Sequence, residues 1–324
     1  MPTASHSAGV PRITAHPVTF SPATPNDGKL NCTAEQARTL NNVLAGKDIV
    51  IGAYFTQKHH PQHGVPVQAA SFDYMADWFH SGIRLGLNMI ILHDGLSSRF
   101  IDKCRFVFSM HTPEAGAGSL HFVPYTPGRF TIADERFFAA RDLLALLPDC
   151  NSAFIVDISD AWFNRNPADL VHRRSLWNYF DSSRLTAAFG NMAAIRSAIT
   201  EQRNVWKRRH NYTIFIGGEV NTIGQNPWMQ EQFTSIYGKE FPEFAALPIR
   251  NCGIVGGTQP VLLTLLTGVC KEMERINIPD KLNDMAVFNY LLHRNDNYTV
   301  YSNGTLNSPW KTWRKRGSHS IFHK

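Results

Sequence analysis

Short apolar runs alternate with stretches of helical spacing along the first half of the chain. The runs are rich in β-branched and other apolar residues, which is typical of strands buried in a parallel sheet. They are 48–55, 88–92, 105–110, 120–124 and 153–156. Helical patterns occupy 31–45, where Thr33 and Gln36 resemble a capping box, 72–85 and 131–147. This alternation predicts an open, mostly parallel α/β sheet with crossover helices.

The second half of the chain continues in the same way and shows no internal repeat. We expect strands at 213–216, 251–255 and 298–301, and helices at 228–237, 260–275 and 284–293. A single α/β domain covering 31–310 is the economical interpretation. A flexible, proline-rich segment, 1–30, precedes it, and a basic tail, 311–324, follows it.

Composition narrows the class of protein. The chain has 324 residues, of which 43% are hydrophobic and 18% charged, and this excludes a disordered chain, a collagen and a coiled coil. No apolar run reaches the roughly 18–20 residues that cross a bilayer, and the first 30 residues lack a secretory signal. We therefore expect a cytoplasmic protein without integral membrane contact. Five cysteines without a CxxC pair predict free thiols rather than zinc ligands or disulfides.

The charge is basic but unevenly placed. Lys and Arg exceed Asp and Glu by 32 to 26, a net +6. Five basic residues and no acid lie in 311–324, and 201–210 carries a net +3. A nucleic-acid-binding protein usually spreads such charge along a face with interleaved aromatics, so no nucleic-acid partner is expected. A phosphate-bearing small ligand fits better, with the tail either a lid over it or a frayed end.

Acidic residues follow several of the expected strands. Asp94 follows the second strand, Asp157 and Asp160 follow the strand at 153–156, and Glu219 follows the strand at 213–216. Ligands of open α/β sheets bind beyond the carboxyl ends of the strands, and carboxylates there suit a hard cation and a phosphate. Asp157 and Asp160 converge only if the chain turns after Asp157, since residues three apart in a straight strand face opposite sides. An Asp that merely caps a turn remains the simpler alternative.

The segment Asp157-Ile-Ser-Asp160-Ala-Trp-Phe-Asn-Arg-Asn-Pro167 resembles the metal motif of GT-A-fold, nucleotide-sugar-dependent glycosyltransferases, in a variant group with Asp-x-x-Asp in place of Asp-x-Asp. Three later segments follow in the order typical of these enzymes. They are the acidic acceptor-side loop 218–228, the Asn-x-Gly-x-x-Gly strand and turn 249–258, and the Asp-x-x-x-x-Asn-Tyr helix 283–293. The resemblance covers roughly residues 48–305.

The resemblance implies a GT-A-like domain that transfers a sugar from a nucleoside diphosphate, with a UDP-sugar favoured, to the hydroxyl of a glycan or another acceptor. It implies that Asp157 and Asp160 bind Mn²⁺ or Mg²⁺, with His293 as a further ligand, and that Asp284 or Glu219 serves as general base. The residues it assigns to the donor are Tyr54, Phe55, Thr56 and Asp94 for base and ribose, Arg136 and Arg141 for the diphosphate, and Gly256, Gly257 and Asn289 for sugar or phosphate.

Simpler interpretations stay open for several of these residues. Arg136 and Arg141 also fit a solvated helix face, Asp284 a helix N-cap, and the glycines a tight strand-to-helix turn. At the level of function, the alternative is a non-catalytic carbohydrate-binding or scaffold protein on a degenerate transferase fold. A metal-dependent phosphohydrolase would need a second metal site, for which the sequence offers no further acidic or histidine cluster.

Overall fold

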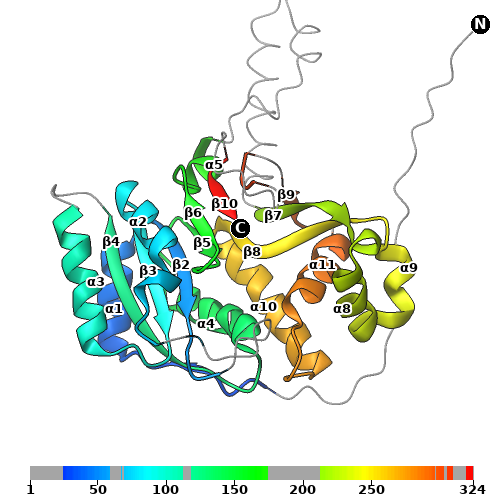
Figure 1. Ribbon diagram of the computed structural model, residues 1–324, viewed down its shortest axis with the longest axis horizontal. Coiled ribbons are helices and arrows are strands. Elements are labelled where there is room, and N and C mark those ends of the chain that lie inside the picture. The colour runs from blue at the N-terminus through cyan, green and yellow to red at the C-terminus, as the bar shows by residue number, and fades with distance from the viewer. Residues whose placement is uncertain are drawn as a thin grey trace, which may run out of the picture.

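The computed structural model describes residues 25–58, 67, 69–111, 118–173, 212–295, 297–302, 305–308 and 319–323. The strands of its main sheet are β1 (Lys29–Leu30), β2 (Asp48–Tyr54), β3 (Asn88–His93), β4 (Ser119–Thr126), β5 (Ser152–Val156), β7 (Thr213–Thr222), β8 (Pro248–Thr258) and β9 (Thr299–Tyr301). They lie in the order β1-β4-β3-β2-β5-β8-β7-β9 (Figure 1). The block β4-β3-β2-β5 is parallel, whereas β8 runs antiparallel to both β5 and β7.

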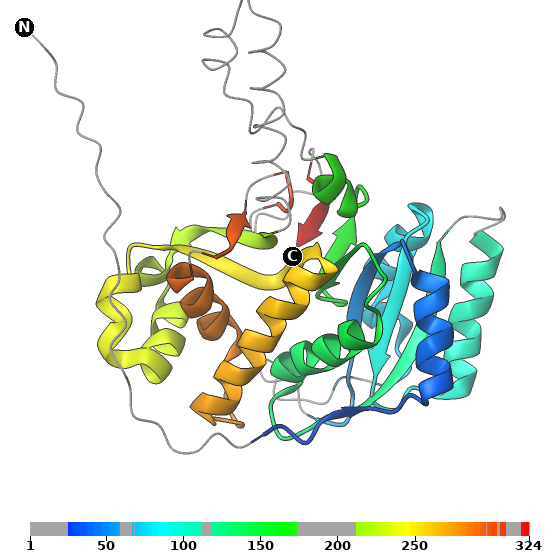
Figure 2. The ribbon, with the colours of Figure 1, turned by 180° about the vertical axis from the view of Figure 1, so that it is seen from behind.

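Helices connect and cover these strands. The α-helices are α1 (Ala34–Leu44), α2 (Ala76–Arg84), α3 (Ser98–His111), α4 (Ile132–Leu146), α5 (Ala168–Arg173), α8 (Pro227–Tyr237), α9 (Phe241–Phe244), α10 (Gln259–Ile276) and α11 (Asp284–Arg294). Short 3₁₀ turns are η1 (Phe72–Tyr74), η3 (Ile223–Gln225) and η4 (Gly238–Glu240). Figure 2 shows α4 and α10 side by side across one face of the sheet.

The order of the parallel strands reverses between β2 and β5. From β2 the chain passes through α2 to β3 and through α3 to β4, and then returns through α4 to β5 on the other side of β2. Because crossovers between parallel strands are right-handed, this reversal puts α4 on the face opposite α2 and α3. Ligands of open α/β sheets bind at such a switch point, beyond the carboxyl ends of the two strands.

Burial explains why the central strands and α4 were predictable. Residues 49–51 of β2, 89–93 of β3 and all of β5 are buried, as the continuous apolar runs require. Helix α4 buries Phe137, Phe138, Leu143 and Leu144, each fully, against the sheet and α10. Burying a side chain of this size contributes roughly 1.5–3 kcal/mol relative to exposure.

The expected open, mostly parallel α/β sheet is confirmed, and so is the capping box of α1. The Thr33 hydroxyl accepts the Gln36 N–H at 3.2 Å, and the Gln36 side-chain oxygen accepts the Thr33 N–H at 2.9 Å. The strand expected at 105–110 is wrong, because these residues form the second half of α3. Phe106 and Met110, four residues apart, share its solvent-facing side.

The expected turn at Gly253, Gly256 and Gly257 is also wrong, since all three lie inside β8. Glu219, expected after its strand, lies within β7, which continues to Thr222. All five cysteines are free, with Cys32 half-buried and the others buried. Among the described helices, none is long and apolar enough to cross a membrane.

A second, two-stranded sheet joins distant parts of the sequence. Strand β10 (Ile321–His323) pairs antiparallel with β6 (Ala161–Phe163), with Phe322 opposite Trp162. Figure 1 shows β10 in the middle of the molecule, near β5 and β8. Within the segment taken as a basic tail, these residues are therefore buried. The basic residues of 311–318 and 201–210 and residue 324 lie outside the described residues, as does the N-terminal segment up to residue 24.

Candidate functional site

A cavity of about 640 Å³ opens at the switch point between β2 and β5. Its walls come from the ends of these two strands, from the middle of β7 and β8, from the first turns of α4 and α11, and from β10. The lining residues on which the chemistry depends are Phe55, Tyr74, Arg136, Asp157, Asp160, Glu219, Asn251, Cys252, Gly253, Asp284 and His323. Five of them, Arg136, Asp157, Asp160, Glu219 and Asp284, were expected from the sequence as charged site residues.

The chain turns directly after β5, as the convergence of the two acids requires. The Asp157 N–H donates to the Gly253 carbonyl at 2.9 Å, which extends the contact between β5 and β8 by one residue. β6 then begins at Ala161, so that Asp157 and Asp160 both line the cavity. The structure thus brings the two carboxylates of the Asp-x-x-Asp motif to one site.

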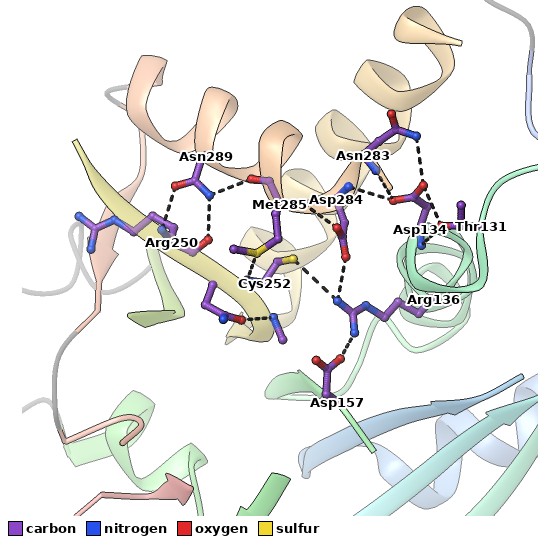
Figure 3. A network of polar contacts seen from close by, with 12 residues as sticks. Thr131, Asp134, Arg136, Asp157, Arg250, Cys252, Asn283, Asp284, Met285 and Asn289 are labelled. Atoms are coloured by element: carbon purple, nitrogen blue, oxygen red, sulfur yellow. Dashed lines mark hydrogen bonds and ion pairs between the residues drawn. The ribbon is translucent and has the colours of Figure 1, made fainter. Parts of the chain in front are cut away.

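Arg136 links two of the acids. Its guanidinium forms an ion pair with Asp157 and a second one with Asp284, in which Nη2 lies 3.0 Å from Oδ2 (Figure 3). The same Nη2 lies 3.7 Å from Sγ of Cys252, a buried thiol whose pKa burial raises well above its usual value. Arg136 is therefore a partly buried cation between two carboxylates, and the solvated-face interpretation does not hold for it.

Asp134 fixes the start of α11 from α4. Its carboxylate accepts the backbone N–H of Asn283 at 3.1 Å and that of Asp284 at 2.9 Å, together with the Asn283 side-chain amide (Figure 3). Burial is the main cause that raises the pKa of Asp134, and the nearby Asp284 carboxylate raises it further. Asp284 itself accepts the Met285 N–H at 2.7 Å through Oδ1 and faces Arg136 through Oδ2. It therefore both binds the first turn of α11 and faces the cavity.

His323 reaches the same acids from the C-terminal strand. Its Nε2 lies 3.5 Å from Oδ2 of Asp157, and its side chain is buried. Burial lowers the pKa of His323 from 6.5 to about 4, although Asp160 and Glu219 raise it and Arg136 lowers it further. The imidazole is therefore neutral at physiological pH, the form that binds metal ions.

Two irregularities in the β7–β8 ladder aim side chains into the cavity. The register moves from Ile216 opposite Val255 to Gly217 opposite Asn251, which leaves residues 252–254 of β8 without partners in β7. Bulges of this kind are common beside active sites, where they redirect side chains. Cys252 and Gly253 line the cavity at this bulge. A Cβ on Gly253 would lie 2.6 Å from Oδ2 of Asp157 and would collide with His323, so glycine is required there.

The residues expected to hold the donor base divide into two kinds. Phe55 lines the cavity directly, whereas Tyr54 is buried and its hydroxyl donates to the Ser71 carbonyl at 2.9 Å. Asp94 accepts the backbone N–H groups of Thr56 and Gln57 at 2.7–2.8 Å and the Thr56 hydroxyl at 3.0 Å. Asp94 and Thr56 therefore shape the loop after β2 rather than line the cavity.

Arg141 and His293 are not brought to the site. Arg141 pairs with its neighbour Asp142 at 2.7 Å and lies over the Phe138 ring, five residues beyond Arg136 on α4. His293 lies at the end of α11, where its Nε2 donates to the Pro248 carbonyl at 2.9 Å. Neither residue lines the cavity. The structure does not bring His293 to the two acids of the cavity, since its contact is at the far end of β8.

Gly256, Gly257 and Asn289 likewise lie outside the cavity lining. Gly256 makes room for the Phe154 ring of β5, with which a Cβ would collide, and Gly257 lies opposite Ala153. Asn289 is fully buried, accepts the Arg250 N–H at 2.8 Å and donates to the Arg250 carbonyl at 2.9 Å. These two hydrogen bonds with the backbone of Arg250 connect α11 to β8. Asn289 lies outside the cavity lining.

Of the lining residues on which the chemistry depends, four were not assigned to the site from the sequence: Tyr74, Asn251, Cys252 and His323. Asn251 donates to Glu219 at 2.8 Å and accepts the Gly253 N–H at 2.8 Å, so it fixes both the acid and the bulge. The glycines around it gave a usable signal, because glycine inside a strand often marks a bulge. His323 gave none, since its place depends on the pairing of three residues with a strand more than 150 positions earlier.

Comparison with known proteins gives a distant likeness only. No family model and no curated protein sequence matches the chain. A crystal structure of the galactosyltransferase LgtC in complex with donor and acceptor sugar analogs is similar over 85% of this chain and 86% of that chain, with 12% identity and a TM-score of 0.45. A structure of an active-site mutant of LgtC is similar over the same shares, with 11% identity and a TM-score of 0.43. A likeness at this level decides nothing about donor, acceptor or metal.

Proposed function

We propose that this protein is a glycosyltransferase that moves a sugar from a nucleoside diphosphate, preferably a UDP-sugar, to an acceptor hydroxyl with the help of Mn²⁺ or Mg²⁺. The observation that carries the proposal is the cavity at the switch point, where Asp157, Asp160 and Asp284 face Arg136 and His323. Two kinds of charge meet there, carboxylates for a cation and a guanidinium for phosphate oxygens.

Three lining residues carry donor atoms of the kinds that a divalent cation binds, although the described side chains do not gather three such groups at one point. Asp157 and Asp160 supply carboxylate oxygens, and His323 supplies a neutral imidazole beside them. Carboxylate and imidazole together suit Mn²⁺ better than Mg²⁺, which prefers oxygen ligands. A bound cation would neutralise the charge that builds up on the diphosphate leaving group. In this proposal His323 takes the place that the sequence assigned to His293.

The chain's own residues bind and orient the donor. Arg136, now paired with two acids, is the one guanidinium among the described lining residues, and it suits the diphosphate through two parallel hydrogen bonds. Phe55 and Tyr74 offer aromatic rings at the end of β2 for the base. Asp94 positions the loop after Phe55 through the Thr56 and Gln57 amides.

Two carboxylates are candidates for the acceptor hydroxyl. Glu219 is held by the Asn251 amide at 2.8 Å, and Asp284 is held by Arg136 and by the first turn of α11. If the reaction inverts the configuration at the sugar, one of them takes the hydroxyl proton as general base. Glu219, on β7, lines the same cavity as Asp284.

The test measures nucleotide binding and sugar release on the full chain. Calorimetric titration with UDP, with and without Mn²⁺, is expected to show binding that depends on the metal. Incubation with a panel of UDP-sugars is then expected to release UDP. An absence of binding and release across uridine, guanosine and cytidine nucleotides contradicts the proposal.

A non-catalytic carbohydrate-binding protein on the same fold is the second candidate. Two observations support it. The Arg136 guanidinium is already paired with the Asp157 carboxylate. Among the described residues, no three His, Cys, Asp or Glu side chains lie close enough together to form a metal site. Saccharide binding without any metal-dependent nucleotide binding favours this second candidate.

A further inference from the structure

Helix α3 carries four exposed side chains in one line along its outer surface. They are Arg99, Lys103, Phe106 and Met110, whose spacing of four, three and four residues places them on one face of an α-helix. Phe106 and Met110 are each 65% exposed. Figures 1 and 2 show α3 at one end of the molecule, packed beside β4. We call these four residues the α3 stripe, and none of them lines the cavity at the switch point.

The two cations of the α3 stripe have no acid to pair with. Asp102, the acid next to Lys103 in the sequence, forms its ion pair with Arg105, in which Nη1 lies 3.6 Å from Oδ1. Within the part of the chain that the structure describes, no carboxylate lies at ion-pair distance from Arg99 or Lys103. The exposed side of α3 therefore carries three basic residues against one acid, and two of the positive charges are open to an external anion.

The stability of α3 does not account for the place of Arg99. This residue lies in the first turn of the helix, and that turn contains no acid. The N-terminal end of a helix carries a partial positive charge, so a cation destabilises it and an acid stabilises it. A negatively charged group outside the protein would be attracted by the Arg99 and Lys103 side chains and by the helix dipole together.

A hollow of about 600 Å³ beside the α3 stripe combines positive charge with apolar surface. Its lining residues are Ser98, Arg99, Asp102, Lys103, Phe106 and Val107. The two unpaired cations lie in the first half of α3, and the two apolar side chains follow them in the second half. This order along the helix suits an amphipathic ligand with a negatively charged head and an apolar chain.

We propose that the α3 stripe docks this protein on the surface of an anionic lipid bilayer. Arg99 and Lys103 bind the phosphates of the headgroups, and Phe106 and Met110 enter the boundary between headgroups and acyl chains. Helices that lie on a membrane combine Lys or Arg with large apolar side chains in this way. The docking surface is separate from the cavity, so the proposal goes beyond the transfer reaction and does not depend on it.

Charge favours a bilayer over a second copy of the chain or a protein partner. The chain carries a net +6, which opposes its association with itself and attracts it to an anionic surface. A protein partner needs acids placed to match Arg99 and Lys103, whereas mobile anionic headgroups reach both cations without a fixed arrangement. The exposed Phe106 and Met110 side chains add the apolar contact that charge alone does not supply.

The test is co-sedimentation of the full chain with phosphatidylcholine vesicles, with and without about 30% phosphatidylglycerol. We expect the wild type to bind the anionic vesicles at least about tenfold more tightly than the neutral ones. Lys103→Glu reverses one charge of the stripe and is expected to weaken this binding by at least about tenfold. Phe106→Ser removes the apolar contact and is expected to weaken it by at least about fivefold.

Two matched controls separate the stripe from the net charge and from exposed rings in general. Lys271→Glu makes the same change of charge at an exposed position of α10, and Tyr212→Ser removes a ring that is 56% exposed just before β7. Both controls are expected to bind anionic vesicles within about twofold of the wild type. All four positions are exposed, so the thermal melts of the variants should stay close to that of the wild type.

The proposal is overturned if the wild type does not bind anionic vesicles, or if Lys103→Glu and Phe106→Ser bind them as tightly as the two controls. Sedimentation equilibrium without vesicles tests the second copy as occupant. A wild-type dimer that Phe106→Ser dissociates would assign the stripe to that contact and overturn membrane docking. Titration with UDP and Mn²⁺ is expected to give equal affinities for Phe106→Ser and the wild type, so a failure of the transferase proposal is seen separately.

Discussion

The guanidinium of Arg136 forms an ion pair with the carboxylate of Asp157 inside the cavity. The pair ties the second turn of α4 to the end of β5, the strand on which the switch point depends. Since the same guanidinium also reaches Asp284, the positive charge is shared between two acids from distant parts of the sequence. A cation or a diphosphate that enters the cavity therefore competes for groups that already have partners.

Arg136→Ala is expected to weaken UDP binding by at least about tenfold, because the diphosphate loses its guanidinium. Arg136→Lys keeps the charge but loses the two-pronged geometry, so an intermediate affinity is expected. Calorimetric titration with UDP and Mn²⁺ measures both variants. Arg141→Ala, on the same helix but outside the cavity lining, is the control and should bind UDP like the wild type. Equal losses for both arginines contradict the assignment.

Removal of Asp134 tests the support of α11. Asp134→Ala leaves the N–H groups of Asn283 and Asp284 without their buried acceptor, which costs about 3 kcal/mol in the free energy of unfolding. Urea denaturation measures this loss. Asp169→Ala, at a partly exposed position in the first turn of α5, should cost less than about 1 kcal/mol. A neutral effect of Asp134→Ala contradicts the role described for its carboxylate.

The buried imidazole of His323 predicts a loss of stability in acid for the metal-free protein. Its pKa is about 4 in the folded chain and 6.5 when exposed, so the unfolded chain binds the extra proton between these values. Stability is therefore complete above about pH 6.5 and falls as the pH drops towards 4, by about 3 kcal/mol at pH 4. Thermal melting between pH 4 and 8 measures the slope.

The variant His323→Asn isolates this contribution, because asparagine does not titrate. Its difference in melting temperature from the wild type should shift in favour of the variant as the pH falls. Parallel curves for His323→Asn and the wild type exclude a buried, neutral His323.

Gly256→Ala tests whether this glycine serves packing or the ligand. Its Cβ would collide with the Phe154 ring in the centre of the sheet, so overpacking of about 1–3 kcal/mol is expected. At Gly238 a Cβ meets nothing within 4 Å, so Gly238→Ala should be neutral or slightly stabilising. Urea denaturation compares the two. A stable Gly256→Ala protein that has lost UDP binding would instead support a ligand contact.

The central parallel strands β2, β3 and β5 could be predicted from the sequence because they are buried along nearly all of their length. Residues 49–51 and 153–156 contain no polar residue. Continuous apolar runs of this kind are typical of strands buried in a parallel sheet. The run at 105–110 misled because Phe106 and Met110, on the exposed side of α3, flank Val107 and Phe108, which pack against the core. A window of six residues is too short to distinguish the helical from the strand periodicity of apolar residues, whereas the full length of α3 is long enough.

The site was partly predictable for the same reason. Asp157 and Asp160 follow a strand that the pattern identifies, so their place at the sheet edge follows from the local sequence. His323 and the bulges in β7 and β8 depend on which strands pair, and on the register of that pairing. Such long-range pairing leaves no local pattern, and the place of His323 beside Asp157 is an example.

Titration of Asp157→Asn with UDP and Mn²⁺ tests the central claim most directly. Asparagine keeps the shape of the side chain but removes the charge that a divalent cation needs. Metal-dependent UDP binding is expected to be lost, while the thermal melt stays close to that of the wild type because Asp157 is partly exposed. Metal-dependent UDP binding that survives in Asp157→Asn would contradict the central claim.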